Sequence, residues 1–136
     1  MSMKQTALDF VNACDGGDGW DVCKKYCHDG ATFSCQADAL ADISTLEAYT
    51  EWAKGLLTPL PDANFEIKAF AVDEERGKAI VAAVFRATHT VDAGSPPTGK
   101  SVATDYTYVM EFDGDRIRRM TKIWNDGHAL RQIGWA

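Results

Sequence analysis

The stretch AIVAAVFRATHT, residues 79–90, and the stretch SVATDYTYVMEF, residues 101–112, decide the fold. Both are rich in β-branched and aromatic residues, which are typical of strands. The loop VDAGSPPTGK joins them, and its Pro96 and Pro97 restrict the backbone there. Strands joined by a short connection are antiparallel. We therefore expect a long hairpin, whose first strand is central because it is apolar on both faces.

Two more strands extend this hairpin in both directions along the chain. Upstream, ANFEIKAFAV (63–72) alternates, which predicts Phe65, Ile67, Ala69 and Ala71 on one face. Downstream, FDGDR forms a tight turn that leads into RIRRMTKIW (116–124). The second half of the chain therefore predicts four antiparallel strands.

The first half of the chain predicts helices and one short strand. The expected elements are a helix over 3–14, a second helix over 20–27 with Asp18 as its N-cap, a strand over 31–35, and a third helix that opens at the capping box STLE with Ser44. Residues 125–136 form a short helix or a tail. This order predicts a single α+β domain over residues 1–136. Three N-terminal helices cover one face of a curved antiparallel sheet, and the resulting cone holds a central pocket.

Composition narrows the possible partners. The net charge of −6 argues against nucleic acid binding, and no apolar run has the length of a membrane helix. The basic residues Arg116, Arg118, Arg119 and Lys122 are interpreted as a solvated strand. The N-terminus shows no signal peptide, so we expect a cytoplasmic protein with neither nucleic acid nor membrane as a partner.

Cofactor and metal sites are not predicted. Cys14, Cys23, Cys27 and Cys35 form no CxxC pair, which favours buried apolar thiols over a metal site. The glycines of DGGDG lie between two helices rather than after a strand, so they do not form a phosphate loop.

Several segments carry a resemblance to a known family: THT, PPTG, FDGDRI, Trp124 and the terminal LRQIGW. Together they resemble the SnoaL-like polyketide cyclase family of the nuclear transport factor 2-like superfamily. That superfamily also holds ketosteroid isomerases, limonene epoxide hydrolase and scytalone dehydratase. The resemblance implies a cystatin-like α+β cone with a deep apolar pocket, a small hydrophobic ligand, and a homodimer formed through the outer face of the sheet.

His89 is the first candidate catalytic residue. It ends a strand whose neighbours of the same parity, such as Val81 and Phe85, are apolar. Two interpretations remain open: a titrating histidine at the rim of the pocket, or a structural histidine that holds the PPTG loop. The resemblance implies a histidine near the pocket in the matching THT segment.

Asp105 and Asp126 are the other two catalytic candidates. Asp105 lies inside a strand, where aspartate is unfavourable unless it faces water or serves the pocket. The resemblance implies a pocket aspartate in this strand that acts as the acid and base of an aldol ring closure. Asp126 follows Trp124 and resembles the aspartate near the last strand of limonene epoxide hydrolase. The alternative for Asp126 is a helix N-cap.

The predicted substrate-binding residues are Phe33, Cys35, Tyr49, Trp52 and Trp124; Tyr106, Tyr108 and Met120 are further lining candidates that by default belong to the core. We expect a cofactor-independent acid/base enzyme, such as a cyclase, isomerase or dehydratase, acting on a small hydrophobic carbonyl compound. The alternatives are a protein that binds such a ligand without turnover and an interaction module that uses the outer sheet face.

Overall fold

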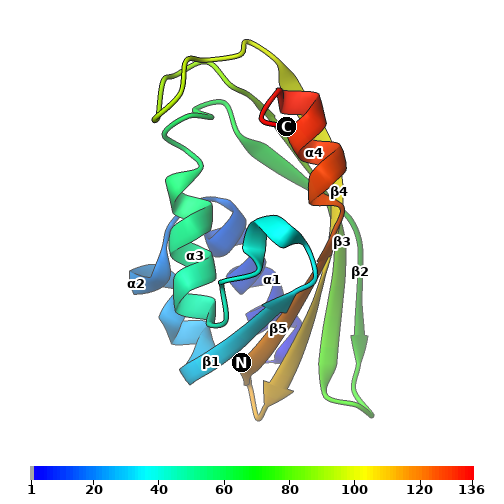
Figure 1. The fold of residues 1–136 in the computed structure, drawn as a ribbon. Coiled ribbons are helices and arrows are strands. Elements are labelled where there is room, and N and C mark those ends of the chain that lie inside the picture. Colours follow the sequence, from blue (N-terminus) through cyan, green and yellow to red (C-terminus); the bar gives the residue numbers. More distant parts are fainter. Residues whose placement is uncertain (1) are drawn as a thin grey trace.

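The computed structural model describes residues 2–136 as four α-helices, two short 3-10 helices and five strands (Figure 1). In chain order the elements are α1 (Met3–Asp15), α2 (Trp20–Cys23), η1 (Lys24–Tyr26), β1 (Cys27–Cys35), η2 (Asp38–Leu40), α3 (Leu46–Gly55), β2 (Asn64–Asp73), β3 (Lys78–Thr88), β4 (Ser101–Asp113), β5 (Arg116–Trp124) and α4 (Asp126–Ile133). The predicted α+β class is confirmed.

The five strands form one open sheet in the order β1-β5-β4-β3-β2. Strands β2 to β5 make the predicted antiparallel meander, with β3 between β2 and β4. The first strand, however, pairs with β5 in parallel. The sheet is therefore mixed rather than wholly antiparallel. The β2–β3 and β4–β5 hairpins were predictable from their short turns, whereas β1 reaches β5 through no hairpin that could reveal its direction.

A bulge in β2 changes the predicted face of its second half. Ile67 pairs with Ala83 and Ala69 pairs with Ala82, so Lys68 has no partner of its own. One extra residue reverses the alternation beyond it. The predicted core positions Ala69 and Ala71 are consequently exposed, and Phe70 and Val72 pack against the core instead.

Two of the predicted helix N-caps are displaced by one residue. The α3 helix is capped by Thr45, whose side chain accepts a hydrogen bond from the amide of Ala48 at 3.1 Å. Ser44 lies one residue before the cap, and its carbonyl accepts from the amide of Phe33 in β1 rather than from the helix. At α2, Gly19 takes the cap position in place of Asp18, and the amide of Trp20 donates to Glu51 Oε2 at 3.1 Å.

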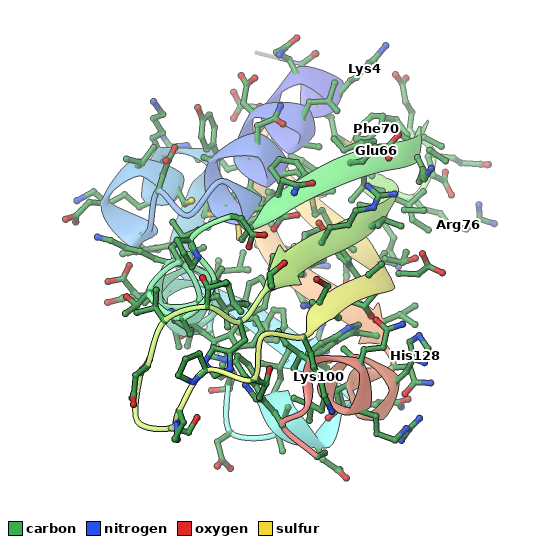
Figure 2. All side chains as sticks on the ribbon, turned by 90° about the horizontal axis from the view of Figure 1, so that it is seen from above. Lys4, Glu66, Phe70, Arg76, Lys100 and His128 are labelled. Carbon is green, nitrogen blue, oxygen red and sulfur yellow. The ribbon has the colours of Figure 1, made fainter. Side chains whose placement is uncertain are left out.

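The helices α1, α2 and α3 lie on one face of the sheet, and α4 packs against β4 at its end (Figure 1). The main core lies between α1, α3 and the sheet and includes Phe10, Leu46 and Met110. A smaller apolar cluster under α4 includes Leu60, Val102 and Ile133. In the view from above, Lys100 and His128 mark the loop after β3 and the helix α4 at this end of the sheet (Figure 2). No helix within residues 2–136 is long and apolar enough to cross a membrane.

Candidate active site

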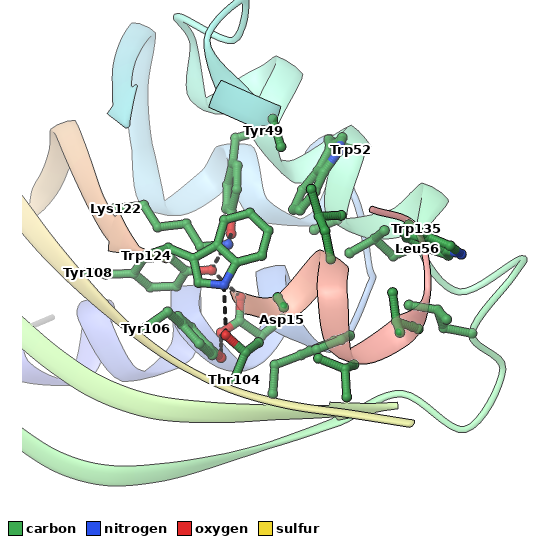
Figure 3. Close-up of a pocket in the computed structure, with 18 residues that line it drawn as sticks. Asp15, Tyr49, Trp52, Leu56, Thr104, Tyr106, Tyr108, Lys122, Trp124 and Trp135 are labelled. Atoms are coloured by element: carbon green, nitrogen blue, oxygen red, sulfur yellow. Dashed lines mark hydrogen bonds between the residues drawn. The ribbon is translucent and has the colours of Figure 1, made fainter. Parts of the chain in front are cut away.

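A cavity of about 240 Å³ lies between α3, α4 and the inner face of strands β3 to β5 (Figure 3). Its lining is mostly apolar: Ala39, Trp52, Ala53, Leu56, Leu60, Phe85, Val102, Trp124, Ala129, Leu130, Ile133 and Trp135. The polar contributors are Asp15, Tyr49, Thr104, Tyr106, Tyr108 and Lys122. An apolar cavity with a few polar groups in one place is the usual form of a small-molecule site.

Lys122 reaches this cavity from β5, on the same strand face as Met120 and Trp124. The residue is only 6% exposed. Its Nζ atom donates a hydrogen bond to the hydroxyl of Tyr49 at 3.0 Å. The ammonium lies 4.2 Å from the ring centroid of Trp124 and between 5.2 and 5.3 Å from those of Tyr49, Trp52 and Tyr106. Electrostatic attraction to the ring faces compensates part of the hydration that the ammonium has lost.

Asp15 contributes a carboxylate from the end of α1. The hydroxyl of Tyr106 donates to its Oδ2 at 2.6 Å, and the hydroxyl of Tyr108 donates to its Oδ1 at 2.7 Å. The helix ends here because Gly17 has a φ of 80°, a conformation that favours glycine. A carboxylate at the negative end of a helix is electrostatically unfavourable, so the structure of α1 does not explain why Asp15 is placed there.

The hydroxyls of Tyr49 and Tyr108 lie 2.5 Å apart and connect the two charged groups. An ammonium can only donate a hydrogen bond, and a carboxylate can only accept one. Tyr49 therefore accepts from Lys122 and donates to Tyr108, which in turn donates to Asp15. The result is a directed chain of hydrogen bonds from a buried cation to a carboxylate, which we call the Lys122–Asp15 relay (Figure 3).

Burial shifts the ionisation of every member of this chain. Loss of hydration raises the pKa of Asp15, although the hydrogen bonds from Tyr106 and Tyr108 and the charge of Lys122 act in the opposite direction. Burial lowers the pKa of Lys122 to about 8, with a partly compensating effect of Asp15. Burial also raises the pKa of Tyr49, Tyr106 and Tyr108, so all three phenols are protonated at neutral pH. Groups with pKa values moved towards neutrality are suited to acid/base chemistry.

Neighbouring side chains hold the rings of the site in place. The indole Nε1 of Trp124 donates to the hydroxyl of Thr104 at 3.0 Å, which orients the ring over Lys122. Phe33 stacks on the far side of Tyr49 with a centroid distance of 4.3 Å. Within residues 2–136, no group of three His, Cys, Asp or Glu side chains has an arrangement that could hold a metal ion.

Comparison with known proteins assigns the family. The model of the SnoaL-like polyketide cyclase family matches residues 5–133. The chain belongs to this family. The resemblance noted in the sequence is thereby confirmed, and it covers almost the whole chain. A search of curated proteins gives no significant match.

Several solved structures share the fold of this SnoaL-like protein. IdmH, a proposed polyketide cyclase from Streptomyces antibioticus, is similar with a TM-score of 0.78 at 16% identity, covering 98% of this chain and 99% of that chain. A proposed polyketide cyclase from Acidithiobacillus ferrooxidans has a TM-score of 0.74 at 24% identity, covering 98% and 95%. AclR, a proposed hydroxylase from Streptomyces galilaeus, has a TM-score of 0.74 at 20% identity, covering 98% and 96%. At these identities the similarity establishes the fold alone, and the chemistry depends on the residues of this chain.

The structure does not bring the three predicted catalytic residues of this SnoaL-like chain together. Asp105 is exposed on the outer face of β4, because the inner face belongs to Thr104, Tyr106 and Tyr108. The prediction of Asp105 and His89 as catalytic residues of the pocket is therefore corrected: neither of them contributes to the cavity wall. The alternation carried a signal for this, since the face with Val102, Tyr106, Tyr108 and Met110 is the more apolar of the two and Asp105 lies on the other.

His89 is buried, and its hydrogen bonds hold the loop after β3 in place. Its Nδ1 accepts from the amide of Thr98 at 3.2 Å and from the indole of Trp135 at 3.0 Å, and its Nε2 donates to the carbonyl of Val91 at 3.0 Å. With both ring nitrogens engaged, His89 ties the PPTG loop to the end of the chain. This is the second of the two interpretations that the sequence left open.

Asp126 acts locally at the start of α4. Its Oδ2 accepts from the amide of Ala39 at 2.8 Å, and its Oδ1 accepts from the amide of Gly127 at 2.9 Å. The N-cap itself is Asn125, whose side chain accepts from the amide of His128. Asp126 thus holds η2 against α4 and does not line the cavity.

The predicted binding residues divide into two groups. Tyr49, Trp52 and Trp124 line the cavity, and their role in substrate binding stays a prediction. Phe33 lies behind Tyr49, and Cys35 is half-buried beside the core; neither lines the cavity.

Sequence reasoning missed Asp15 and Lys122. Asp15 is the first residue of the DGGDG segment that ends the first helix, and nothing local distinguishes it from a surface residue. For Lys122 a signal was present, since Met120, Lys122 and Trp124 share one strand parity and Met120 and Trp124 were expected to face inwards. However, Lys122 also belongs to a run of basic residues, which favoured the interpretation of a solvated strand.

Proposed function

We propose that this protein is a cofactor-independent acid/base enzyme that acts on a small hydrophobic carbonyl compound. The proposal is supported above all by the Lys122–Asp15 relay, in which an ammonium and a carboxylate of shifted pKa both line the same apolar cavity. Maintaining two charged groups in such surroundings is costly for stability, which is typical of functional sites.

The two ends of the relay have complementary roles in this mechanism. The carboxylate of Asp15 accepts a proton from the carbon next to the substrate carbonyl, and the C–H electron pair moves into an enolate. The ammonium of Lys122 stabilises the negative charge that develops on the enolate oxygen. The enolate then either regains a proton or attacks a second carbonyl of the same molecule, as in an aldol ring closure.

The cavity restricts the substrate by size and polarity. Its volume of about 240 Å³ corresponds to roughly eight water molecules at about 30 Å³ each. A compound of one or two small rings fits this space. The ring faces of Trp52 and Trp124 and the side chain of Leu56 offer apolar contacts to such a molecule.

Exchange of α-protons in the ketone 2-tetralone tests this proposal without knowledge of the natural substrate. Wild-type protein in D₂O should accelerate loss of the α-proton signal in NMR spectra. Lys122→Met and Asp15→Asn should each reduce that acceleration about a hundredfold, the usual scale of a lost acid or base. Asp105→Asn is the matched control, because Asp105 is exposed on the other face of the sheet. Equal exchange rates in wild type and Asp15→Asn would contradict the proposal.

The alternative is a binding protein that uses the same cavity without turnover. It is favoured by one observation: the polar atoms of the relay are already hydrogen-bonded to each other. In that case 2-tetralone would quench the fluorescence of Trp52 and Trp124 with no exchange of its α-protons, and Asp15→Asn would bind it as tightly as the wild type.

A second copy of the chain is the partner that we propose for the outer face of the sheet. There, Ile80 pairs across the strands with Val109 and Ile123 pairs with Thr107, so apolar and small side chains form continuous rows. Ile80 is 44% exposed and Ile123 is 61% exposed. Exposed apolar rows of this kind are typical of protein interfaces.

A further inference from the structure

Lys122 differs from every other lysine in residues 2–136. The others are exposed or half-buried, whereas Lys122 is 6% exposed and lines the cavity. Its Nζ donates to a neutral hydroxyl, that of Tyr49, rather than to a carboxylate. An ammonium held by a neutral partner gives up its proton more readily than one in a direct ion pair.

We propose that Lys122 forms a covalent imine with the carbonyl carbon of a small apolar aldehyde or ketone in the cavity. The inference rests on the proposed function, in that it uses the same cavity and the same class of substrate, but it adds a covalent step. A lysine amine in an apolar pocket is a known chemical solution for activating carbonyl compounds.

The covalent step balances with the groups that the structure provides. The neutral amine attacks the carbonyl carbon and a C–N bond forms, while the π electron pair of the C=O bond moves to the oxygen, which takes an N–H proton to give a carbinolamine. The nitrogen lone pair then displaces the oxygen: the C–O bond breaks, the oxygen leaves as water with a second proton, which Asp15 supplies, and a protonated imine remains. Sodium cyanoborohydride can reduce this imine to a stable secondary amine.

The Lys122–Asp15 relay gives the protons of this step a route. The ammonium passes a proton to Tyr49, Tyr49 passes one to Tyr108, and Tyr108 passes one to Asp15, so a neutral amine and a neutral carboxyl result. The proton stored on Asp15 can return to the departing hydroxyl group. Because the charges cancel rather than separate, the low polarity of the cavity reduces the free-energy cost of this transfer.

The surroundings of Lys122 favour both the amine and the product. The charged or titratable groups around it are Asp15 and Cys14 from α1, Tyr49 from α3, Cys35 from β1, and Tyr106 and Tyr108 from β4. With a pKa of about 8, about a tenth of the amine is neutral at pH 7, against less than about one in a thousand for an exposed lysine. The rings of Trp52 and Trp124 can stabilise a protonated imine as they stabilise the ammonium.

Reductive trapping tests the inference. The protein is incubated with benzaldehyde and sodium cyanoborohydride at pH 7, and labelled peptides are quantified by mass spectrometry. In the expected product, the mass added to Lys122 equals the mass of benzaldehyde less one oxygen atom. Lys4, which projects from α1 (Figure 2), and Lys100 serve as internal controls because both are exposed. Lys122 should be labelled at least ten times faster than either, and a rate equal to theirs would overturn the inference.

Two variants test whether the relay, and not only the accessibility of the amine, determines the rate at which Lys122 is labelled. Tyr49→Phe removes the hydroxyl that accepts from Lys122 and should slow labelling of Lys122 several-fold. Tyr26→Phe is the matched control, since Tyr26 lies outside the cavity wall. An unchanged rate in Tyr49→Phe would overturn the role of the relay in the covalent step.

The outcomes also distinguish this inference from the proposed function. Labelling of Lys122 without α-proton exchange in 2-tetralone would support the imine and contradict the acid/base enzyme. Exchange without labelling would overturn the imine and leave the acid/base enzyme in place. Lys122→Arg gives a further check, because it keeps the positive charge but cannot form an imine.

Discussion

Among single residues, the site depends on a buried ammonium, that of Lys122, and a half-buried carboxylate, that of Asp15, which are not in direct contact. Three tyrosine hydroxyls satisfy the charged ends of Lys122 and Asp15. Within residues 2–136, no buried side-chain nitrogen or oxygen lacks a hydrogen-bond partner. Removing one member of such a network leaves the others unsatisfied, so the effects of single substitutions will not add.

The ionisation of Lys122 should make stability depend on pH. Its pKa of about 8 in the folded protein lies below the ordinary value of about 10.4 in the unfolded chain. Between these values the unfolded chain holds more protons than the folded protein, so the free energy of unfolding rises as the pH rises. Relative to Lys122→Met, wild type should gain up to about 3 kcal/mol between pH 8 and pH 10.5.

Urea unfolding of both proteins across this pH range measures the effect. Comparison with the variant removes the contributions of Cys23 and Cys27, whose raised pKa values of about 12 act in the opposite direction. A stability difference that stays constant with pH would contradict the shifted pKa of Lys122.

Asp15 should control the pH at which Lys122 reacts. The carboxylate raises the pKa of Lys122 and so opposes part of the effect of burial. Asp15→Asn should therefore move the midpoint of reductive labelling of Lys122 below pH 8, while the labelling profile of Lys4 stays unchanged. A midpoint that moves upwards would show that the two groups do not interact as the structure indicates.

At the scale of elements, the loop after β3 depends on His89 for its connection to the end of the chain. The ring of His89 binds the amide of Thr98 and the indole of Trp135, and Thr98 in turn donates to the carbonyl of Ile133 at 2.6 Å. Since Trp135 and Ile133 line the cavity, His89 shapes the site from behind its wall.

His89→Leu should destabilise the protein by about 2–3 kcal/mol, because it removes the three hydrogen bonds of a buried ring, each of about 1 kcal/mol. Hydrogen exchange should increase in residues 90–100 and 134–136, with little change in α1. Asp92→Ala is a suitable control in the same loop, since Asp92 is exposed and bonds only to the amide of Gly94. Equal protection of the loop in His89→Leu and wild type would contradict the structural role of His89.

The secondary-structure elements differ in how far the sequence could predict them. The meander and the helices followed from alternation and turn residues, because those signals are local. The direction of β1 and the bulge at Lys68 depend on partners far along the chain. The prediction of the site failed for a related reason. Its polar residues come from four separate elements, and only packing brings them together: Asp15, Tyr49, Tyr106 and Lys122.

At the scale of the whole molecule, the two faces of the sheet serve different purposes. The inner face holds the cavity, and the outer face exposes rows of apolar and small side chains around Ile80 and Ile123. In the proposed dimer, substitutions in the cavity would therefore leave the interface unchanged.

Ile123→Lys tests the outer face. Light scattering after size-exclusion chromatography should find a dimer for wild type and a monomer for the variant, because a charge in the apolar rows opposes pairing. Val22→Lys is the control, because it changes an exposed apolar residue on α2 and should leave the dimer intact. Ile117→Val is not suitable, because Ile117 is fully buried. A monomeric wild type would contradict the proposed interface.

The central claim is that Asp15 and Lys122 act on carbonyl compounds in the cavity. Exchange of the α-protons of 2-tetralone, followed by NMR for wild type, Asp15→Asn and Asp105→Asn, tests it most directly. Exchange should be rapid in wild type and Asp105→Asn and about a hundredfold slower in Asp15→Asn. Exchange that is lost in Asp105→Asn but retained in Asp15→Asn would contradict it.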